Sequence, residues 1–571
     1  MDTYISSSKN SILAVKDAIP ELNLQLIAVL IFSCIATRVI TGLQSRPKRV
    51  REGEPHTVRK LPYWIPWIGH SISFFDGDRD FVIRAGRMMN EPVFGLHIAG
   101  ETFNIVLAPS LVNSVFSQRG ASTDFLVYQI AERLFGDGGM FRTMNPNDHK
   151  SLHHSLSFLM RDPSLTDVSS AALKSIERET PNLVSFCRSV VDQASWERHG
   201  EVTVIDGSTP ACEANLFALT RNFVGYITTS VFMGQAILDF YPDLLQDLWT
   251  LDSQSYSLMA GAPRWLPHPG VSAAYAARYR LQKVIATFQA AFGEAEDGRD
   301  PGVEFRDLDD ISELERVRLR VWKRLGYAPA AKASGDLGFL WAMNINSTNT
   351  VFWNILRIIT DRKLLSAVRE EIAPFVKVSR ISPEESGLPI PEPPQLSIDL
   401  DGLFTLCPIT KAIMFETFRL HSNSLSYRRL ATDLTITESA DDAKIAGIRQ
   451  PRTYRFRKGD TIVMPHGVHQ VDSRYFPNPE KFDYSRFITT DSGKGVKRVD
   501  MGTIKPFGGG ISACKGRHFV EREMLAFTAA ILSMWDIEPV SDEGWKIPSM
   551  VPSPGSYRPS KDVRVRLRIR V

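Results

Sequence analysis

The sequence predicts a helix-rich α+β chain with small β-sheets and one helix that crosses a membrane. Long segments with apolar residues at helical spacing outnumber short strand-like runs, and one apolar stretch near the N-terminus is long enough to span a bilayer. The 571 residues are 43% hydrophobic and 23% charged, as in ordinary folded proteins, which excludes a disordered or fibrous chain. Five scattered cysteines form no CxxC pair, which disfavours a disulfide framework and a zinc site. Because the net charge is +3 without a long basic stripe, we expect no nucleic-acid partner.

The apolar stretch from Leu22 to Ile40 has nineteen residues, and few strongly polar side chains interrupt it. The alternatives to a membrane anchor are a cleaved signal peptide and a buried core helix, but no clean small-residue cleavage site follows. Six basic residues lie between positions 46 and 60, against two lysines before the stretch. The positive-inside rule therefore places the C-terminal body in the cytosol.

The chain divides into four predicted segments. Residues 1–21 are a tail, 22–40 the transmembrane anchor, 41–70 a basic linker with a proline hinge, and 71–571 one large domain. The hinge is predicted because Leu61 to His70 holds two prolines, which fix the backbone, and two tryptophans, which favour a membrane interface.

Within the large domain, apolar periodicity predicts seven helices, at 81–89, 110–119, 215–232, 273–292, 335–360, 409–420 and 518–535. Alternating patterns predict strands at 102–107, 434–437, 454–457, 461–464 and 563–570. An acidic stretch, 294–315, and a proline-rich stretch, 379–397, are interpreted as surface loops and not as linkers between domains.

Candidate chemistry is concentrated around Cys514, in the segment KPFGGGISACKGRHFVEREM that starts at Lys505. The glycines let backbone approach a flat ligand, and backbone N–H groups and the start of the next helix are expected to lower the pKa of the thiol. The residues alone leave three interpretations: a redox nucleophile, a phosphate-binding loop, or an axial ligand to haem iron. A phosphate loop is disfavoured, since no GxxxxGK[ST] pattern forms and no strand-forming run precedes the glycines.

The spacing Phe507-x-x-Gly510-x-x-x-Cys514-x-Gly516 resembles the haem-thiolate loop of cytochromes P450. Two further features follow the order of that family, the ExxR segment from Glu416 to Arg419 and the aromatic segment around Arg486. The resemblance covers nearly the whole chain. It implies the cytochrome P450 fold, a haem-thiolate catalytic domain over 71–571, and haem b bound through the Cys514 thiolate, with Phe507, Gly510 and Gly516 beside it.

The resemblance also assigns supporting roles. Glu416, Arg419 and Arg486 would form a buried structural triad that fastens the cysteine loop. Arg429, with Arg428 as its competitor, would bind a haem propionate. Where the family often has a Trp-x-x-x-Arg helix, this chain has His149 and His153, which could donate to a propionate or form a solvated face. Ser512 replaces a frequent basic residue two positions before the cysteine, so one propionate contact is expected to be weak or absent.

The predicted helix 335–360 departs from the usual acid–alcohol pair of the family, because Ile345 and Asn346 stand at those places. Its pattern, with LWA at 340–342 and FW at 352–353, resembles the subgroup of bile-acid sterol hydroxylases and prostacyclin synthase. Asn346 with Ser347 is therefore the candidate pair on the oxygen side. The alternative is that these polar residues only bend and hydrate the helix.

The resemblance implies a single-pass enzyme of the endoplasmic reticulum membrane that takes electrons from NADPH-cytochrome P450 reductase and uses O2 to hydroxylate a lipophilic small molecule. The aromatic-rich region 215–292 is interpreted as the substrate access region, which suits a sterol, a terpenoid or a polyketide-derived metabolite, and we expect a role in secondary metabolite biosynthesis. The alternative function is a haem-thiolate isomerase or dehydratase that needs neither O2 nor a reductase.

Overall fold

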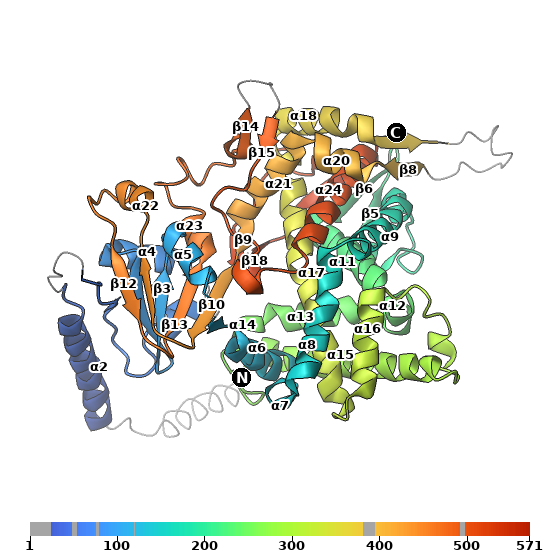
Figure 1. Ribbon diagram of the computed structural model, residues 1–571. Helices are drawn as coiled ribbons and strands as arrows, with labels where there is room; N and C mark the ends of the chain where they lie inside the picture. Colours follow the sequence, from blue (N-terminus) through green and yellow to red (C-terminus); the bar gives the residue numbers. More distant parts are fainter. Residues whose placement is uncertain are drawn as a thin grey trace, which may run out of the picture.

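A computed structural model describes residues 24–47, 54–75, 79–118, 120–380, 394–490 and 497–570. A sheet-rich part lies at the left of Figure 1, next to the N-terminal helix α2, and a larger helical part lies at the right. The long helix α17 runs between the two parts. This arrangement matches the predicted helix-rich α+β class with small sheets.

The helices have regular boundaries that local residues explain. Pro329 supplies the fixed φ of a first helical turn at the start of α17, and the Asp361 side chain accepts hydrogen bonds from Lys363 N and Leu364 N at the start of α18. The α-helices are α2 Leu24–Gln44, α3 Ser71–Phe75, α4 Arg79–Met89, α5 Pro109–Phe116, α6 Asp124–Ile130, α7 Met140–Thr143, α8 Pro146–Ser155, α9 Ser164–Glu179, α10 Ser195–His199, α11 Leu216–Met233, α12 Ala236–Phe240, α13 Leu244–Ser253, α14 Ser255–Met259, α15 Pro269–Glu296, α16 Glu313–Arg324, α17 Pro329–Ile359, α18 Arg362–Ile372, α20 Leu400–Leu406, α21 Pro408–His421, α22 Ala440–Ile445, α23 His466–His469 and α24 Arg517–Met534.

The largest sheet has the strand order β1-β2-β3-β13-β10-β4. Its central strand pairs run parallel between β3 and β13 and antiparallel between β13 and β10, where Arg428 lies opposite Ile462. The strands are β1 Arg59–Lys60, β2 Val93–Ile98, β3 Glu101–Val106, β4 Ala121–Ser122, β5 Thr203–Ile205, β6 Ala211–Asn215, β7 Val376–Ser379, β8 Gln395–Ile398, β9 Ser422–Asn423, β10 Leu425–Leu430, β11 Leu434–Thr437, β12 Thr453–Phe456, β13 Thr461–Pro465, β14 Ile488–Thr490, β15 Lys497–Val499, β16 Trp535–Pro539, β17 Met550–Pro552, β18 Gly555–Pro559 and β19 Arg564–Ile569.

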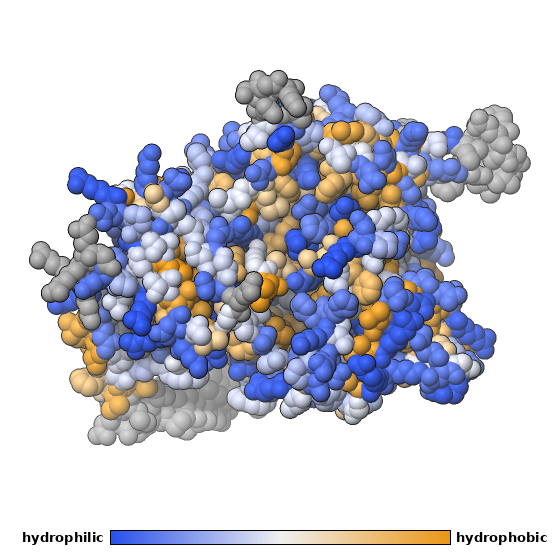
Figure 2. Space-filling view, viewed as in Figure 1, coloured by the Kyte–Doolittle hydropathy of each residue, from blue (hydrophilic) through white to orange (hydrophobic). Residues whose placement is uncertain are grey.

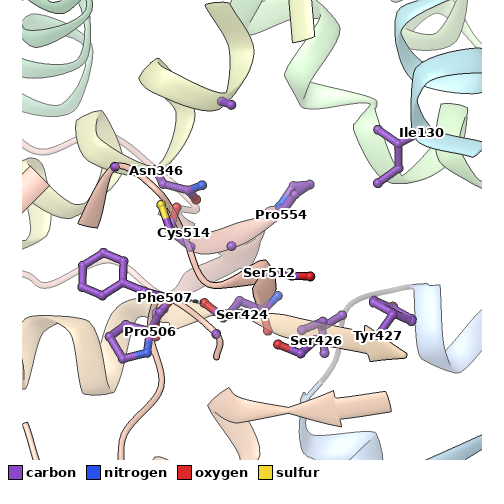
Figure 3. Close-up of a pocket in the computed structure, with 18 of the residues that line it drawn as sticks. Ile130, Asn346, Ser424, Ser426, Tyr427, Pro506, Phe507, Ser512, Cys514 and Pro554 are labelled. Carbon is purple, nitrogen blue, oxygen red and sulfur yellow. Dashed lines mark hydrogen bonds between the residues drawn. The ribbon is translucent and has the colours of Figure 1, made fainter. Parts of the chain in front are cut away.

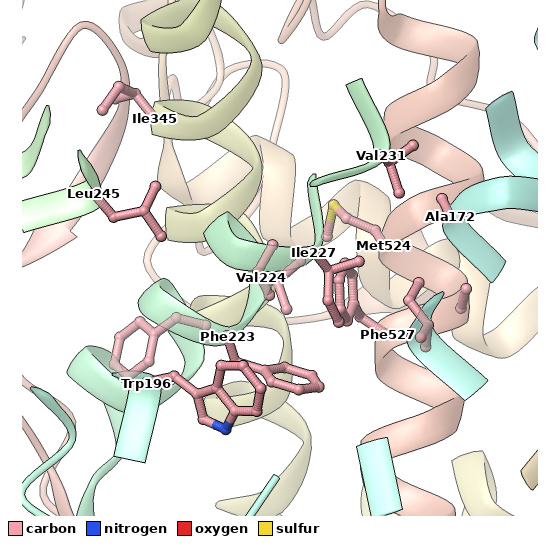
Figure 4. Packing of buried hydrophobic residues seen from close by; sticks show 14 of the residues in the cluster. Ala172, Trp196, Phe223, Val224, Ile227, Val231, Leu245, Ile345, Met524 and Phe527 are labelled. Atoms are coloured by element: carbon pink, nitrogen blue, oxygen red, sulfur yellow. The ribbon is translucent and has the colours of Figure 1, made fainter. Parts of the chain in front are cut away.

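The main core lies where α11, α17 and α24 meet. Figure 4 shows Phe223 and Ile227 of α11 against Phe527 of α24, and the Phe223 and Phe527 ring centroids are 6.0 Å apart. Trp196 closes the same cluster at 5.5 Å from Phe223. Close packing of this kind fixes how α17 sits over the cysteine loop that precedes α24.

The predicted helices and strands are present with boundaries shifted by a few residues, and α15 and α17 extend beyond their predictions. The predicted loop 294–315 is partly wrong, because α15 continues to Glu296 and α16 begins at Glu313. The predicted loop 379–397 is partly wrong, because Ser379 belongs to β7 and residues 395–397 to its partner strand β8; residues 381–393 lie outside the described residues.

The predicted anchor corresponds to α2, which continues past Ile40 to Gln44, whereas Leu22 and Asn23 lie outside the described residues. The span long and apolar enough to cross a membrane is Ile27–Gln44. The tail 1–21 and the basic residues at 48–53 lie outside the described residues. In Figure 2 the apolar surface of α2 lies at the lower left. Exposed aromatic side chains continue near this helix at Trp64 and Trp67.

Hydrogen bonds connect the end of α2 to the predicted hinge. Tyr63 N donates to Thr41 Oγ1 at 3.3 Å, Arg59 Nε donates to Ser45 O at 2.9 Å, and Arg38 donates to the carbonyl of Pro62. Part of the predicted linker, Arg59–Lys60, is strand β1 of the large sheet. The segment is therefore packed on the sheet, which differs from a free linker.

Deletion of residues 1–40 is expected to release the protein from membranes only in part. Trp67 is 68% exposed and Trp64 is 55% exposed, so their rings can still enter the interface. The measurement is the fraction of protein that sediments with vesicles. The same deletion carrying Trp64→Ala and Trp67→Ala is the comparison, and full solubility of the simple deletion would contradict this expectation.

Candidate active site

The loop before α24 places Cys514 at the wall of a cavity of about 580 Å³. Backbone N–H groups of Gly516 and Arg517 donate hydrogen bonds to the Cys514 sulfur. Figure 3 shows Cys514 and Asn346 facing the same cavity, with Ile130 and Tyr427 farther along its wall.

The sequence predicted a lowered pKa for Cys514, and this expectation is wrong for the protein alone. The side chain is exposed to the cavity, and desolvation by the protein atoms around that cavity raises the pKa of the thiol. The two backbone N–H groups and the Arg517 and Lys515 charges lower it by less.

The loop glycines permit left-handed backbone angles and a close approach of the loop to Phe116. Gly508 and Gly510 have φ of +65° and +66°, and a Cβ on Gly510 would lie 2.8 Å from Phe116 O. A Cβ on Gly509 would lie 2.4 Å from the Phe116 ring. Gly510 therefore allows the loop to turn against α5 and is not among the residues that line the cavity, unlike Phe507 and Gly516.

The structure brings the predicted triad together. Arg419 Nε and Nη2 each donate to a Glu416 oxygen at 2.7 Å, and both side chains are fully buried. Arg486 Nε lies 3.6 Å from Glu416 Oε1, and Asp483 N donates to the same oxygen at 2.8 Å. The carboxylate thus joins α21 to the segment that contains Arg486.

Gln470 extends this ion pair to the cysteine loop, a link that the sequence did not indicate. Arg419 Nη1 donates to Gln470 O at 2.7 Å, and Lys505 N donates to Gln470 Oε1 at 3.4 Å. Gln470 is completely buried. The loop begins at Lys505, so its first residue is hydrogen-bonded to the group that holds Arg419.

The predicted propionate ligand Arg429 needs correction. Its guanidinium pairs with Glu101 at 2.8 Å, and its side chain is 39% exposed. Its neighbour Arg428 is buried, and its Nη2 donates to Gly509 O at 2.9 Å in the cysteine loop. Side chains alternate along β10, so Arg428 faces the loop and Arg429 the other side of the sheet.

The two histidines of α8 have different surroundings. His149 Nε2 is 2.7 Å from Phe141 O, so it satisfies a local backbone group. His153 lies near Lys515: desolvation and then the Lys515 charge lower its pKa. Of the two, His153 is the better placed for a ligand at the cysteine loop.

A further candidate that the sequence analysis missed is His466. Its Nε2 is 2.9 Å from Ser426 Oγ, and Ser426 lines the cavity. Burial, with nearby positive groups that include Arg428, lowers the pKa of His466 to about 3, so the ring is neutral at physiological pH. A neutral imidazole can donate one hydrogen bond to a carboxylate here.

The cavity wall above Cys514 is largely apolar, but its origin differs from the prediction. From the predicted access region 215–292 only Phe232, Tyr256 and Met259 are among the lining residues of this cavity. Other large side chains come from α6, α17, α21, β10 and the cysteine loop: Phe125, Leu126, Ile130, Phe339, Trp341, Met343, Phe418, Leu425 and Phe507.

On α17, Asn346 and Ser347 both line the cavity, and Ile345 is buried in the core. Figure 4 shows Ile345 on the same side of the core as Leu245, and Ile345 is not among the residues that line the cavity. Ser347 Oγ donates to Met343 O at 3.0 Å, which commits its hydroxyl hydrogen to the helix. The amide of Asn346 is thus the more available of the two predicted groups.

The comparisons agree with this geometry. Residues 337–565 match the cytochrome P450 family model. The chain belongs to the cytochrome P450 family. The prediction of a P450 monooxygenase is confirmed.

Two relatives cover almost the whole length of this P450. It is 26% identical over 500 residues to "Cytochrome P450 monooxygenase poxD" of Penicillium oxalicum, covering 86% of this chain and 90% of the relative. It is 24% identical over 545 residues to human 7-alpha-hydroxycholest-4-en-3-one 12-alpha-hydroxylase, covering 93% and 97%. Retinoic-acid-bound cyanobacterial CYP120A1 has the same fold, with a TM-score of 0.60 and 17% identity over 90% of this chain and 99% of that one.

Either Glu416→Ala or Arg419→Ala is expected to prevent accumulation of folded holoprotein. Removing one partner of a buried ion pair leaves a buried charge, at a cost of about 3–5 kcal/mol. The measurement is haem per protein together with the melting temperature. Arg455→Ala is the matched control, because that arginine also pairs with a carboxylate, Asp433, but at the surface. A Glu416→Ala holoprotein with normal stability would refute the structural role.

Proposed function

We propose that this P450 is a membrane-anchored monooxygenase that hydroxylates a bulky lipophilic substrate such as a sterol, a terpenoid or a polyketide-derived metabolite, in secondary metabolite biosynthesis. The observation that carries the proposal is the largely apolar lining of the cavity that Cys514 borders, which haem and substrate would share. An apolar lining of this kind suits a hydrocarbon skeleton. The hydroxylase and monooxygenase names of the two relatives support the reaction type.

The residues present fit a haem b with a thiolate ligand. Cys514 offers a sulfur that opens into the cavity and already accepts two backbone hydrogen bonds. We assign Phe507 and Gly516 to the walls around the haem, with Arg428, His153 and His466 on its propionates, and Glu416, Arg419 and Arg486 to the support of the loop. When bound, haem supplies the activation of O2 that hydroxylation needs.

The protein's own contribution on the substrate side is to exclude water and to position one polar group. Apolar side chains such as Phe339 and Ile130 surround the space. Asn346 can donate a hydrogen bond from its amide and can hold a water molecule, but it relays a proton less readily than a carboxyl group. Its task in this proposal is to hold the water that delivers a proton on the oxygen side, with Ser347 as the neighbouring candidate.

The electrons would come from NADPH-cytochrome P450 reductase, and the location would be the endoplasmic reticulum membrane, crossed once by α2 with residues 71–571 as the cytosolic catalytic domain. The apolar helix α2 supports the anchor. The five cysteines are all free thiols, which suits a reducing compartment.

The alternative is a haem-thiolate isomerase or dehydratase that acts on a peroxide or pre-oxidised substrate. It is favoured by one specific observation: the position of the usual acid holds the buried Ile345. Product analysis by mass spectrometry with labelled O2, with and without reductase, over a panel of sterols and terpenoids separates the two. Label in the product only when reductase is present supports the monooxygenase; unlabelled product without reductase supports the isomerase.

Cys514→Ser is expected to abolish the thiolate-type Soret band of the ferrous carbonyl complex, because a hydroxyl does not replace the thiolate ligand. The measurement is the carbonyl difference spectrum of purified protein. Cys187→Ser is the matched control and keeps the band, since Cys187 lies in a distant, partly exposed loop. Retention of the band in Cys514→Ser would refute the assignment of Cys514 as the haem ligand.

Asn346→Ala is expected to divert reducing equivalents to peroxide or water while haem content stays unchanged. General acid–base groups contribute about 100-fold or more to proton transfer. Without this group, release of peroxide or water should therefore outcompete hydroxylation of the substrate. The measurement is product formed per NADPH consumed with reductase present. If coupling stays tight, Asn346 has no part in oxygen activation and Ser347 becomes the next candidate.

A further inference from the structure

Strand β18 runs against one face of α17 directly beside the cavity. Three successive residues of the strand contact α17 residues separated by three and four positions, which share one face of a helix. Gly555 packs against Asn346, and Asn349 Nδ2 donates to Ser556 Oγ at 3.0 Å. Trp353 Nε1 donates to the backbone carbonyl of Tyr557 at 2.8 Å. The contact fixes the register between strand and helix.

Gly555 is the closest of these contacts. A Cβ there would lie 2.6 Å from Asn346 Oδ1 and 2.8 Å from Asn346 Nδ2, so the bare backbone packs on the amide plane. Its φ of +84° lies in the left-handed region that favours glycine, and Ser553 N donates to Ser556 O across this turn at 3.2 Å. Both the turn and the packing therefore require glycine at this position.

The amide of Asn346 has no other support among the described residues. Its Oδ1 is buried without a hydrogen-bond partner there, while the residue itself lines the cavity. The other polar side chains of α17 on the cavity wall are committed to the helix: Ser347 Oγ donates to Met343 O, and Thr350 Oγ1 donates to Asn346 O at 2.8 Å. The orientation of this amide thus depends on what packs against it.

The strand that packs there is itself held in place. Gly555 and Ser556 pair antiparallel with Asn423 and Ser422 of β9, which directly follows α21. Asn349 and Ser556 are fully buried, so the hydrogen bond between them is shielded from water. A shift of β18 along α17 would break this bond and move the backbone away from Asn346.

We propose that Gly555, Ser556 and Asn349 are positioning residues that hold the Asn346 amide in one orientation, so that it presents a hydrogen-bond donor to the cavity above Cys514. This inference rests on the proposed oxygenase function and deepens it, because it states how the oxygen-side group is kept in place. None of the three residues need contact the reacting atoms. Their effect reaches the reaction through Asn346.

The test uses full-length holoprotein with reductase and compares Gly555→Ala, Ser556→Ala and Asn349→Ala with wild type. Two quantities are measured: product per NADPH, and the C–O stretching frequency of the ferrous carbonyl complex. A donor beside bound CO lowers that frequency, so loss of the oriented amide should raise it, as in Asn346→Ala. Ser556→Thr keeps the hydroxyl acceptor and should restore both values toward wild type.

Ser560→Ala is the matched control, because Ser560 lies at the far, exposed end of the same hairpin and bonds Ser549 there. It should leave coupling and frequency unchanged. If Gly555→Ala does not fold, the Ser556→Ala variant tests the inference instead, since it removes one hydroxyl and adds no atom. Folded Ser556→Ala and Asn349→Ala enzymes with wild-type coupling and frequency would overturn the inference while the oxygenase function stands. A wild-type protein that forms no labelled product would instead overturn the proposed function.

Discussion

The buried ion pair between Glu416 and Arg419 is the interaction on which the site depends. Removed from water, the two charges are tolerable only because every remaining donor and acceptor has a partner. Those partners are backbone groups of Gln470, Pro479 and Asp483, which belong to segments far from α21 in the sequence. The pair therefore holds these segments against α21. Gln470 connects it to the start of the cysteine loop through its hydrogen bond with Lys505 N.

Several parts of the site could be predicted from the sequence because they depend on local spacing. The cysteine loop needs glycines at fixed offsets from Cys514, and the ExxR pair lies one helical turn apart, so both are visible without a structure. The helices with strong apolar periodicity, such as α11 and α17, were predictable for the same reason.

Other features depend on contacts between distant segments, and the sequence could not supply them. Arg428 and Arg429 are chemically identical neighbours, and only the strand register decides which one faces the cysteine loop. The cavity wall draws on α6, whose short apolar run has no distinctive pattern. The pKa of Cys514 rises because desolvation outweighs the nearby donors, and that balance requires knowledge of the surrounding atoms.

The hydrogen bonds from α2 to the segment before β1 have a consequence for encounters at the membrane. Thr41 and Ser45 at the end of the helix are bonded to Tyr63 and Arg59, so the catalytic body is connected to α2 by more than a flexible linker. With α2 in a bilayer, as proposed, rotation of the body would be mainly about the bilayer normal. A redox partner that is also confined to the bilayer would meet the same face of the enzyme at a constant height, so their association becomes a two-dimensional search with a limited set of orientations.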